Sequence, residues 1–388
     1  MIIDELRIVG STQTNVVMHA ELTRIAQRAL HRRPPDPRKE GLGQLVYPFD
    51  PELARVAVTY LRTPTRVLWD VYRSRAERLE PLYDDLIADI ANDGRALWRD
   101  GDGISVEARR VDDFAAGERQ VVGTVKNALI DAVARRGKRL HVDPHRADTR
   151  WVARLDEQHE LVISIDLGGG SLSQRGWRRD AGDAPLREHL AAVLLMLARF
   201  DPRKDVLVDP MCGSGTIPIE AVLLARATPR PTPALQALGL AQPGAEPLYA
   251  DAAPLVVGCD VELDVLAAAR DNARAAKIGD AVTWQRCDVA DLRPDMIAQI
   301  ASERGRPAPE TGLLLANPPY GERLDDQDLE VLYRVIAETC RRFSGWRAGF
   351  LVGNPLLERE FMRYLGRPRI KKPLANANLR AYFYLYEL

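Results

Sequence analysis

The second half of the sequence alternates short apolar runs with amphipathic segments of helical period. The apolar runs lie at 206–209, 255–260, 282–288, 312–317 and 347–353. Helical segments fill the intervals between them, as at 216–227, 262–277 and 328–343. Strands that follow one another through helices form a parallel sheet covered on both faces. The pattern therefore predicts an α/β fold with a doubly wound sheet, closed by the alternating aromatic strand AYFYLYEL.

The first half of the sequence follows a different pattern and predicts two smaller regions. Residues 1–60 combine a short apolar strand and a helix with a segment at 31–44 that is rich in Pro and Gly and cannot be helical. Residues 61–165 alternate strands and helices over about one hundred residues, which is a usual domain size. We therefore predict a small, partial ferredoxin-like region at 1–60, an α+β domain at 61–165 and the doubly wound domain at 166–388. A segment at 228–254, rich in Pro and Ala, is an insertion in the last of these.

Composition places the chain among ordinary globular proteins. Apolar residues make up 46% of the 388 positions and charged residues 28%. The N-terminal residues do not resemble a secretory signal, and the longest apolar run, at 190–198, is too short for a membrane span. A cytoplasmic location without membrane contact is expected. The four cysteines are far apart and lack metal-ligand spacing, so neither a disulfide framework nor a bound metal is predicted.

Basic residues gather locally although the net charge is only −1. Residues 135–154 hold seven Arg or Lys against two Asp, and residues 359–372 hold six around Glu360. Solvated surface is the usual explanation for any one such cluster. Several clusters together favour a polyphosphate partner such as RNA.

The segment DPMCGSGT (209–216) joins the first strand of the doubly wound domain to its helix. Gly213 and Gly215 allow a tight turn, and the helix that starts at Thr216 offers a positive N-terminus to an anionic group. No Lys follows Gly215, which argues against a P-loop, and Pro218 stands where a dinucleotide-binding loop has its third glycine. The loop also encloses a cysteine, which a bound cofactor would cover, so that this thiol is not expected to act as a nucleophile.

Polar residues end four successive strands of this domain. They are Asp209, Asp260, Asp288 and Asn317, and ligands of such sheets bind beyond the carboxyl ends of the strands. Asp260 can accept both hydroxyls of a ribose, and Asp288 can accept an adenine amino group. An adenosine with a charged amino acid tail indicates S-adenosylmethionine.

The tetrapeptide NPPY at 317–320 predicts the position of the methyl acceptor. The prolines restrict the backbone, so that the Pro318 carbonyl can point beside the side-chain oxygen of Asn317. Two acceptors suit a planar NH₂ group and would localise its lone pair toward the methyl group, without a strong base. Tyr320 offers a ring on which a flipped base can stack. A plain Pro-Pro loop over a packed aromatic is the alternative.

These motifs resemble class I SAM-dependent methyltransferases that carry an N-terminal THUMP domain, in particular the bacterial RNA guanine-N2 methyltransferases. The resemblance covers most of the chain. It includes SVEARRVDDF and GTVKNALIDAV in the THUMP part, and DPMCGSGTIPIEAVLLA, GCDVELDVLAAARDNARAAKI and NPPYGERL in a Rossmann-like domain with a seven-stranded sheet. The cofactor site that it implies comprises Gln174, Arg175, Asp209, Cys212, Gly213, Ser214, Gly215, Thr216, Asp260 and Asp288.

The resemblance also implies the reaction. Asn317, Pro318, Pro319 and Tyr320 would hold the amine, and the THUMP domain would bind structured RNA. Charge alone places the RNA contact at Arg135, Arg136, Lys138 and Arg139. The expected activity is methylation of guanine N2, in 23S ribosomal RNA ahead of transfer RNA, by a monomer with one catalytic domain. Residues 1–60 lack the Gly-Leu-Glu helix usual in the family.

Other functions stay open on the sequence alone. Adenine N6 and protein glutamine N5 are also acceptors for NPPY motifs, although a THUMP-like half argues against both. A noncatalytic RNA-binding protein is a third possibility, which the intact glycine loop disfavours.

Overall fold

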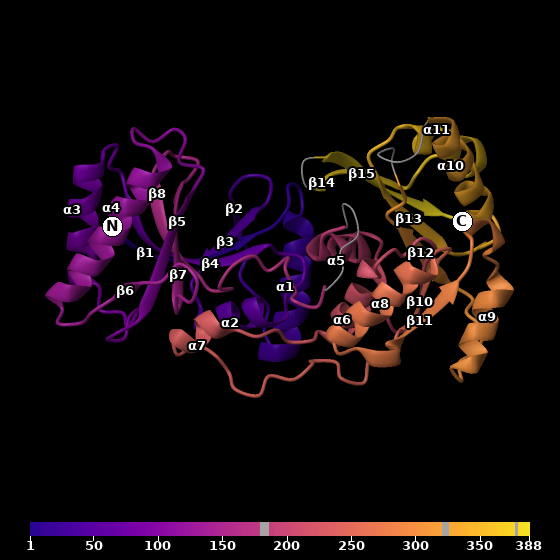
Figure 1. Cartoon of the computed structure of the whole chain (residues 1–388), viewed down its shortest axis with the longest axis horizontal. Helices are drawn as coiled ribbons and strands as arrows, with labels where there is room; N and C mark the ends of the chain where they lie inside the picture. Colours follow the sequence, from indigo (N-terminus) through magenta and orange to yellow (C-terminus); the bar gives the residue numbers. More distant parts are fainter. Residues whose placement is uncertain (179–185, 320–325, 377–378) are drawn as a thin grey trace. The chain divides into compact units, whose positions relative to one another are not determined.

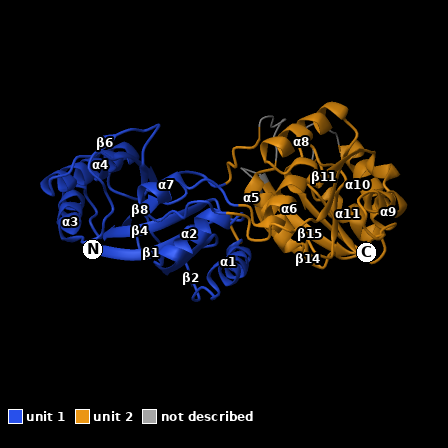
Figure 2. Ribbon diagram, turned by 90° about the horizontal axis from the view of Figure 1, so that it is seen from below, with its two compact units in different colours: residues 1–10, 14–172, 229–245 blue, residues 11–13, 173–228, 246–388 orange. Residues whose placement is uncertain are grey.

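The computed structural model describes residues 1–178, 186–319, 326–376 and 379–388. The chain forms two compact units (Figure 2). The first comprises residues 1–10, 14–172 and 229–245, and the second comprises residues 11–13, 173–228 and 246–388. Within the described residues, no helix combines the length and the apolar character that a membrane crossing requires.

The first unit is built on a single eight-stranded sheet, whose strands lie in the order β2-β3-β1-β4-β8-β7-β5-β6. The strands are β1 (Ile2–Val9), β2 (Arg38–Lys39), β3 (Gln44–Pro48), β4 (Arg66–Ser74), β5 (Gly103–Arg109), β6 (His141–Val142), β7 (Thr149–Leu155) and β8 (Leu161–Asp166). The helices are α1 (Asn15–Leu30), α2 (Pro51–Tyr60), α3 (Leu79–Asn92), α4 (Glu118–Arg135) and α7 (Pro233–Ala237). Because β4 pairs with both β1 and β8, the sheet continues across the boundary expected at residue 60.

A buried ionic network ties the middle of this sheet together. The guanidinium of Arg7 on β1 lies 2.8 Å from Asp70 on β4 and 2.9 Å from Glu40. Arg154 on β7 reaches the same Asp70 carboxylate at 2.9 Å, and the Ser164 hydroxyl donates to it at 2.6 Å. Burial raises the pKa of Asp70, but the two guanidiniums and the Ser164 hydroxyl together lower it further, so the net pKa lies below its usual value. Removing one member would leave buried charge unpaired, so these strands depend on one another.

The segment 229–245 belongs to the first unit, although in the sequence it lies between α6 and β10, which belong to the second unit. Its helix α7 packs against β7, and the Leu235 side chain is fully buried. The Arg230 amide donates to the carbonyl of Thr59 at 3.1 Å, and its guanidinium donates to Leu61. The predicted insertion is thus an integral part of the N-terminal unit.

The second unit is a seven-stranded mixed sheet in the order β11-β10-β9-β12-β13-β15-β14 (Figure 1). Its strands are β9 (Val206–Asp209), β10 (Leu255–Asp260), β11 (Val282–Arg286), β12 (Gly312–Ala316), β13 (Arg347–Val352), β14 (Ile370–Asn376) and β15 (Leu379–Glu387). Its helices are α5 (Glu188–Leu197), α6 (Thr216–Arg226), α8 (Leu263–Ala275), α9 (Pro294–Glu303), α10 (Asp326–Cys340) and α11 (Leu356–Tyr364), with short 3₁₀ turns η1 (Gly279–Ala281) and η2 (Val289–Asp291). Strands β9 to β13 are parallel. Strand β15 runs antiparallel to β13, and β14 runs antiparallel to β15 and so in the same direction as β9 to β13.

Helices cover both faces of this sheet, as the apolar pattern predicted. Alternate strand residues such as Val208, Leu314 and Phe350 form one core with α9, α10 and α11. On the other face, α6 packs on β9 and β10, and α8 packs on β10 and β11. The α/β fold with a Rossmann-like seven-stranded sheet is confirmed. The polar residues that end β9, β10 and β12 consequently lie along one edge of the sheet.

Candidate functional site

The glycine loop is fastened to the end of the neighbouring strand. After β9 ends at Asp209, the Cys212 amide donates to the carbonyl of Cys259 on β10 at 2.8 Å. The Gly213 amide donates to Oδ2 of Asp260 at 3.0 Å. The turn closes when the Gly215 amide donates to the Cys212 carbonyl at 2.9 Å, just before α6 begins. A backbone held at these points offers a rigid surface to a ligand.

The two glycines of this loop meet different surroundings. Both have positive φ, +52° at Gly213 and +84° at Gly215, which side chains seldom adopt. A Cβ on Gly215 would stand 2.6 Å from Cη2 of Trp284. A Cβ on Gly213 would meet no heavy atom of the described residues within 4 Å. Gly213 therefore borders open space at the carboxyl edge of the sheet, as a loop that cradles a cofactor should.

The three aspartates at the strand ends differ in exposure and in the bonds they make. Asp209 is buried, its Oδ1 accepts the Met211 amide at 3.2 Å, and burial raises its pKa, to which the nearby Asp260 charge adds. Asp260 is half-buried and keeps lone pairs beyond those used by the loop. Asp288 is exposed and caps η2 by accepting the Ala290 amide at 2.8 Å. Asp209 thus supports the loop from beneath, while Asp260 and Asp288 are accessible to a ligand.

The two predicted cofactor residues that precede the glycine loop in the sequence differ in exposure. Gln174 is exposed. Nε of Arg175 lies 3.3 Å from Oε1 of Glu220 on α6, and both side chains are almost wholly buried. The Thr216 hydroxyl at the start of α6 accepts from Arg178 at 2.9 Å. Arg175 therefore forms a structural contact with α6, and its role at the cofactor stays a prediction.

Asn272 on α8 is a loop contact that the sequence did not reveal. It is fully buried, and its side-chain amide donates to the Ser214 carbonyl at 3.1 Å. Together with Cys259 and Asp260, it anchors the glycine loop from the second strand and its helix. The sequence feature that could have identified Asn272 is its polar side chain at a core position of an amphipathic helix.

The acceptor segment follows β12 directly. Asn317 is half-buried, yet its Oδ1 is buried and has no hydrogen-bond partner within the described residues. Pro318 is buried and Pro319 is exposed. Tyr320 lies outside the described residues. An unpaired buried acceptor costs free energy unless a ligand satisfies it, so Asn317 is arranged to receive a donor.

Tyr333 holds the acceptor segment in place and was also missed by the sequence analysis. It lies fully buried on α10, and its hydroxyl donates to the Pro319 carbonyl at 2.8 Å. Because Pro has no N–H, this carbonyl is the main-chain polar group through which the residue can be tied to the core. Tyr333 fits the apolar stripe of α10, so the sequence pattern explains it as an ordinary core residue.

The predicted RNA-binding residues lie at and beyond the C-terminal end of α4 in the first unit. Arg136 donates to the carbonyls of Ile90 and Asp93 at 3.1 and 2.7 Å. Lys138 donates to the Trp98 carbonyl at 2.9 Å. Arg135 and Arg139, like the other two residues of the cluster, are exposed. Half of the cluster is thus engaged in fixing the end of α3 and the segment after it.

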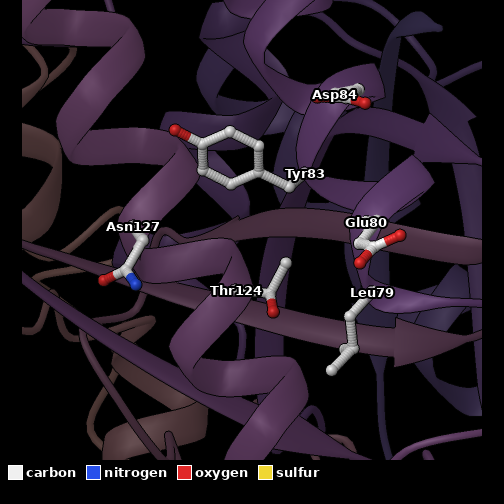
Figure 3. A pocket seen from close by; sticks show the side chains of 6 residues that line it. All are labelled: Leu79, Glu80, Tyr83, Asp84, Thr124 and Asn127. Atoms are coloured by element: carbon white, nitrogen blue, oxygen red, sulfur yellow. The ribbon is translucent and has the colours of Figure 1, made fainter.

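A cavity of 460 Å³ lies between α3 and α4 and contains none of the predicted site residues (Figure 3). Its lining consists of Leu79, Glu80, Tyr83, Asp84, Thr124 and Asn127. The Tyr83 hydroxyl donates to Asp131 at 2.6 Å. Carboxylates at this place repel phosphate, so the cavity is unsuited to nucleic acid.

Comparison with known proteins points to one enzyme class. Residues 175–372 match the model of the family described as RMKL-like, methyltransferase domain. The chain is 39% identical over 256 residues to the ribosomal RNA large subunit methyltransferase K/L of Syntrophotalea carbinolica, which covers 60% of this chain and 34% of that protein. The chain thus spans about a third of the length of the curated relatives it matches.

Solved structures share the fold over nearly the whole chain. A predicted N6-adenine-specific DNA methylase from Listeria monocytogenes is 25% identical, with a TM-score of 0.78 over 99% of this chain and 96% of that one. A putative methyltransferase, SMU.472, solved with S-adenosylhomocysteine, is 23% identical, with a TM-score of 0.79 over 99% and 98% of the two chains. The family match confirms the methyltransferase class and S-adenosylmethionine as the cofactor. The matched residues begin at 175, and the THUMP assignment of the N-terminal part stays a prediction.

Proposed function

Because the chain belongs to the RMKL-like methyltransferase domain family, we propose that it methylates the exocyclic N2 of a guanosine in structured RNA. Large-subunit ribosomal RNA is the favoured substrate and transfer RNA the next. The curated relatives, named for large-subunit ribosomal RNA, support this choice of molecule. The choice of guanine N2 comes from the resemblance described above.

The cofactor would lie over the glycine loop. Gly213 leaves room beside the backbone, and Asp260 and Asp288 are accessible acceptors for the ribose and the adenine amino group. Bound there, S-adenosylmethionine supplies a methyl group on a positively charged sulfur. The contacts of Cys212, Gly213 and Asn272 hold the loop still while the ligand is bound.

The observation that carries the proposal is the buried Oδ1 of Asn317, which has no hydrogen-bond partner among the residues that the structure describes. This acceptor follows β12, which pairs with β9, the strand that leads into the glycine loop. An amine that donates to Asn317 and to the Pro318 carbonyl would be oriented with its lone pair toward the cofactor. Positioning of this kind accounts for large accelerations without a general base. Tyr333 would hold the segment in this position by donating to the Pro319 carbonyl.

Substitution of Asn317 tests this assignment. Asn317→Ala should lower the rate of methyl transfer by about a hundredfold or more, because an acceptor of the reacting amine is lost. Binding of S-adenosylmethionine, measured by calorimetry, should be retained, since Asn317 lies outside the glycine loop.

Asn354 provides a matched control. It follows the neighbouring strand β13, and its side chain accepts the Leu356 amide at 2.9 Å at the start of α11. Asn354→Ala should cost roughly 1 kcal/mol of stability through the lost hydrogen bond to the Leu356 amide and leave transfer intact. Turnover by Asn317→Ala at the rate of the unaltered chain would refute the acceptor assignment.

An adenine-N6 acceptor is the competing possibility, because the Listeria relative carries that description. An NPPY segment suits any planar amine, so the geometry of Asn317 does not separate the two bases. The chemical identity of the methylated nucleoside decides between them.

A further inference from the structure

The hairpin of β14 and β15 extends past the edge at which the acceptor segment lies. Ala316, the last residue of β12, is level with Phe350 of β13, and Phe350 pairs with Tyr384 of β15. Residues 379–382 of β15 therefore lie at or beyond the level of Asn317. Two strand spacings separate β15 from β12, which places the hairpin roughly 10 Å to the side of the acceptor.

One face of this hairpin combines an exposed ring with cations. Arg380, Tyr382 and Tyr384 alternate along β15, and Lys371 pairs with Tyr384 across the hairpin, so all four point to the same face. Arg380 and Lys371 are exposed, and Tyr382 is 38% exposed. On the opposite face, Phe383 is fully buried. Tyr384, on the same face as Tyr382, is buried in the core, so only the part of this face near the start of β15 is exposed.

The cation next to Tyr382 is held in position. Nζ of Lys371 lies 5.1 Å from the centre of the Tyr382 ring and 2.6 Å from the Glu358 carboxylate. The ammonium occupies one side of the ring. Arg380 lies two residues before Tyr382, near the start of β15.

An exposed aromatic ring between cations is how single-stranded nucleic acid is held without dependence on sequence. The ring stacks on a base, and the cations neutralise the phosphates on either side. A duplex would present its phosphates but keep its bases stacked away from Tyr382. A peptide offers neither a regular negative charge nor a flat partner for the ring.

We propose that the β14–β15 hairpin holds an unpaired stretch of RNA beside the target base. A base next to the target stacks on Tyr382, and its phosphate contacts Arg380, while Lys371, which is paired with Glu358, holds the Tyr382 ring in position. This inference rests on the proposed RNA methyltransferase function and specifies which part of the substrate the second unit binds. Of the basic residues at 359–372, Arg363 pairs with Glu360, Arg369 with Glu387 and Lys371 with Glu358.

Binding of a labelled single-stranded RNA of 12 nucleotides of mixed sequence, and of its duplex, tests the inference on the full chain in the presence of S-adenosylhomocysteine. Tyr382→Ala should weaken binding of the single strand about tenfold, whereas Tyr382→Phe should bind as the unaltered chain does. Binding of the duplex should not change. Equal single-strand affinity for Tyr382→Ala and the unaltered chain would overturn the inference, and so would failure of the unaltered chain to bind the single strand.

The charge contribution is tested through salt. Arg380→Ala should reduce the slope of log affinity against log salt by about 0.7, the value for one contact to a single strand. Arg203→Ala is the matched control, since Arg203 is an exposed arginine that precedes β9 and so lies at the opposite edge of the same sheet. Equal slopes for the two variants would contradict the phosphate contact.

Transfer assays separate this inference from the proposed function. If the function is right and the hairpin is the contact, Tyr382→Ala should raise KM for unmodified large-subunit ribosomal RNA with little change in kcat. An unchanged KM in an active chain would refute the hairpin alone. Absence of transfer by the unaltered chain would instead refute the function, while the binding measurements would still decide the hairpin.

Discussion

At the scale of residues, the two glycines of the cofactor loop allow stability and binding to be separated. Gly213→Ala introduces a methyl group into open space and should cost only about 1 kcal/mol in the free energy of unfolding. The same methyl group would fill the place proposed for the cofactor, so calorimetry should show binding weakened by at least about tenfold. Gly215→Ala forces a methyl group against Trp284 and should lower stability more.

The two variants should therefore differ in both stability and cofactor binding. Denaturant unfolding without ligand should rank Gly215→Ala as less stable than Gly213→Ala. Normal cofactor binding by Gly213→Ala would show that the cofactor does not lie against this part of the loop.

Tyr333 and Tyr386 form a matched pair of buried tyrosines in one core. Tyr333→Phe removes the donor to Pro319 and should lower kcat about fivefold, the worth of one neutral hydrogen bond, without changing cofactor affinity. The Tyr386 hydroxyl is buried and makes no hydrogen bond within the part of the chain that the structure describes. Tyr386→Phe should therefore leave kcat unchanged, and an equal loss in both variants would assign Tyr333 to general stability.

Individual residues of the site were predictable where their type is unusual at their position. Glycines after a strand and aspartates or asparagine at strand ends stand out, so Gly213, Asp260 and Asn317 could be proposed from the sequence, and their roles stay predictions. Asn272 and Tyr333 were not, because each lies within an amphipathic helix whose period explains it without a function. The burial of Arg175 against Glu220 depends on a long-range contact that spacing does not encode.

At the scale of elements, Arg136 and Lys138 of the predicted RNA-binding cluster donate to main-chain carbonyls at the end of α3 and in the segment after it. Arg136→Ala should lower the free energy of unfolding by about 2 kcal/mol, because two carbonyls near the end of α3 lose a charged donor. Arg135→Ala and Arg139→Ala should leave stability nearly unchanged and each reduce the salt slope of RNA binding by up to about 0.9. Denaturation and salt titration of RNA binding check both expectations. A salt slope unaffected by either exposed arginine would move the RNA surface of this unit elsewhere.

The strands of the second unit were predictable because each is a short apolar run between helices. Their parallel order follows from that alternation, and the site at their carboxyl ends follows from the order. The continuous sheet of the first unit was not predictable. Its continuity depends on β4 pairing with both β1 and β8 and on the buried network around Asp70, and both are long-range pairings.

At the scale of the whole molecule, the segment 229–245 belongs to the unit from which it is distant in sequence. Its two ends are close, because the Tyr249 amide donates to the Arg226 carbonyl at 3.1 Å. A short Gly-Ser linker can therefore replace the segment without stretching the second unit. The replacement should expose the surface of β7 that α7 covers and lower the stability of the first unit.

Hydrogen exchange checks this expectation unit by unit. Amides of β7 and β8 should exchange faster after the replacement, whereas those of β9 and β10 should keep their protection. Faster exchange in the second unit alone would show that the segment stabilises the domain from which it emerges.

The central claim is that this chain moves a methyl group from S-adenosylmethionine to guanine N2 in RNA. The most direct test incubates the full chain with isotopically labelled S-adenosylmethionine and unmodified large-subunit ribosomal RNA, followed by digestion and mass spectrometry of the nucleosides. We expect label in N2-methylguanosine, at one position of the RNA, and its loss in Asn317→Ala. Label in N6-methyladenosine, or none in any nucleoside of ribosomal or transfer RNA, would contradict it.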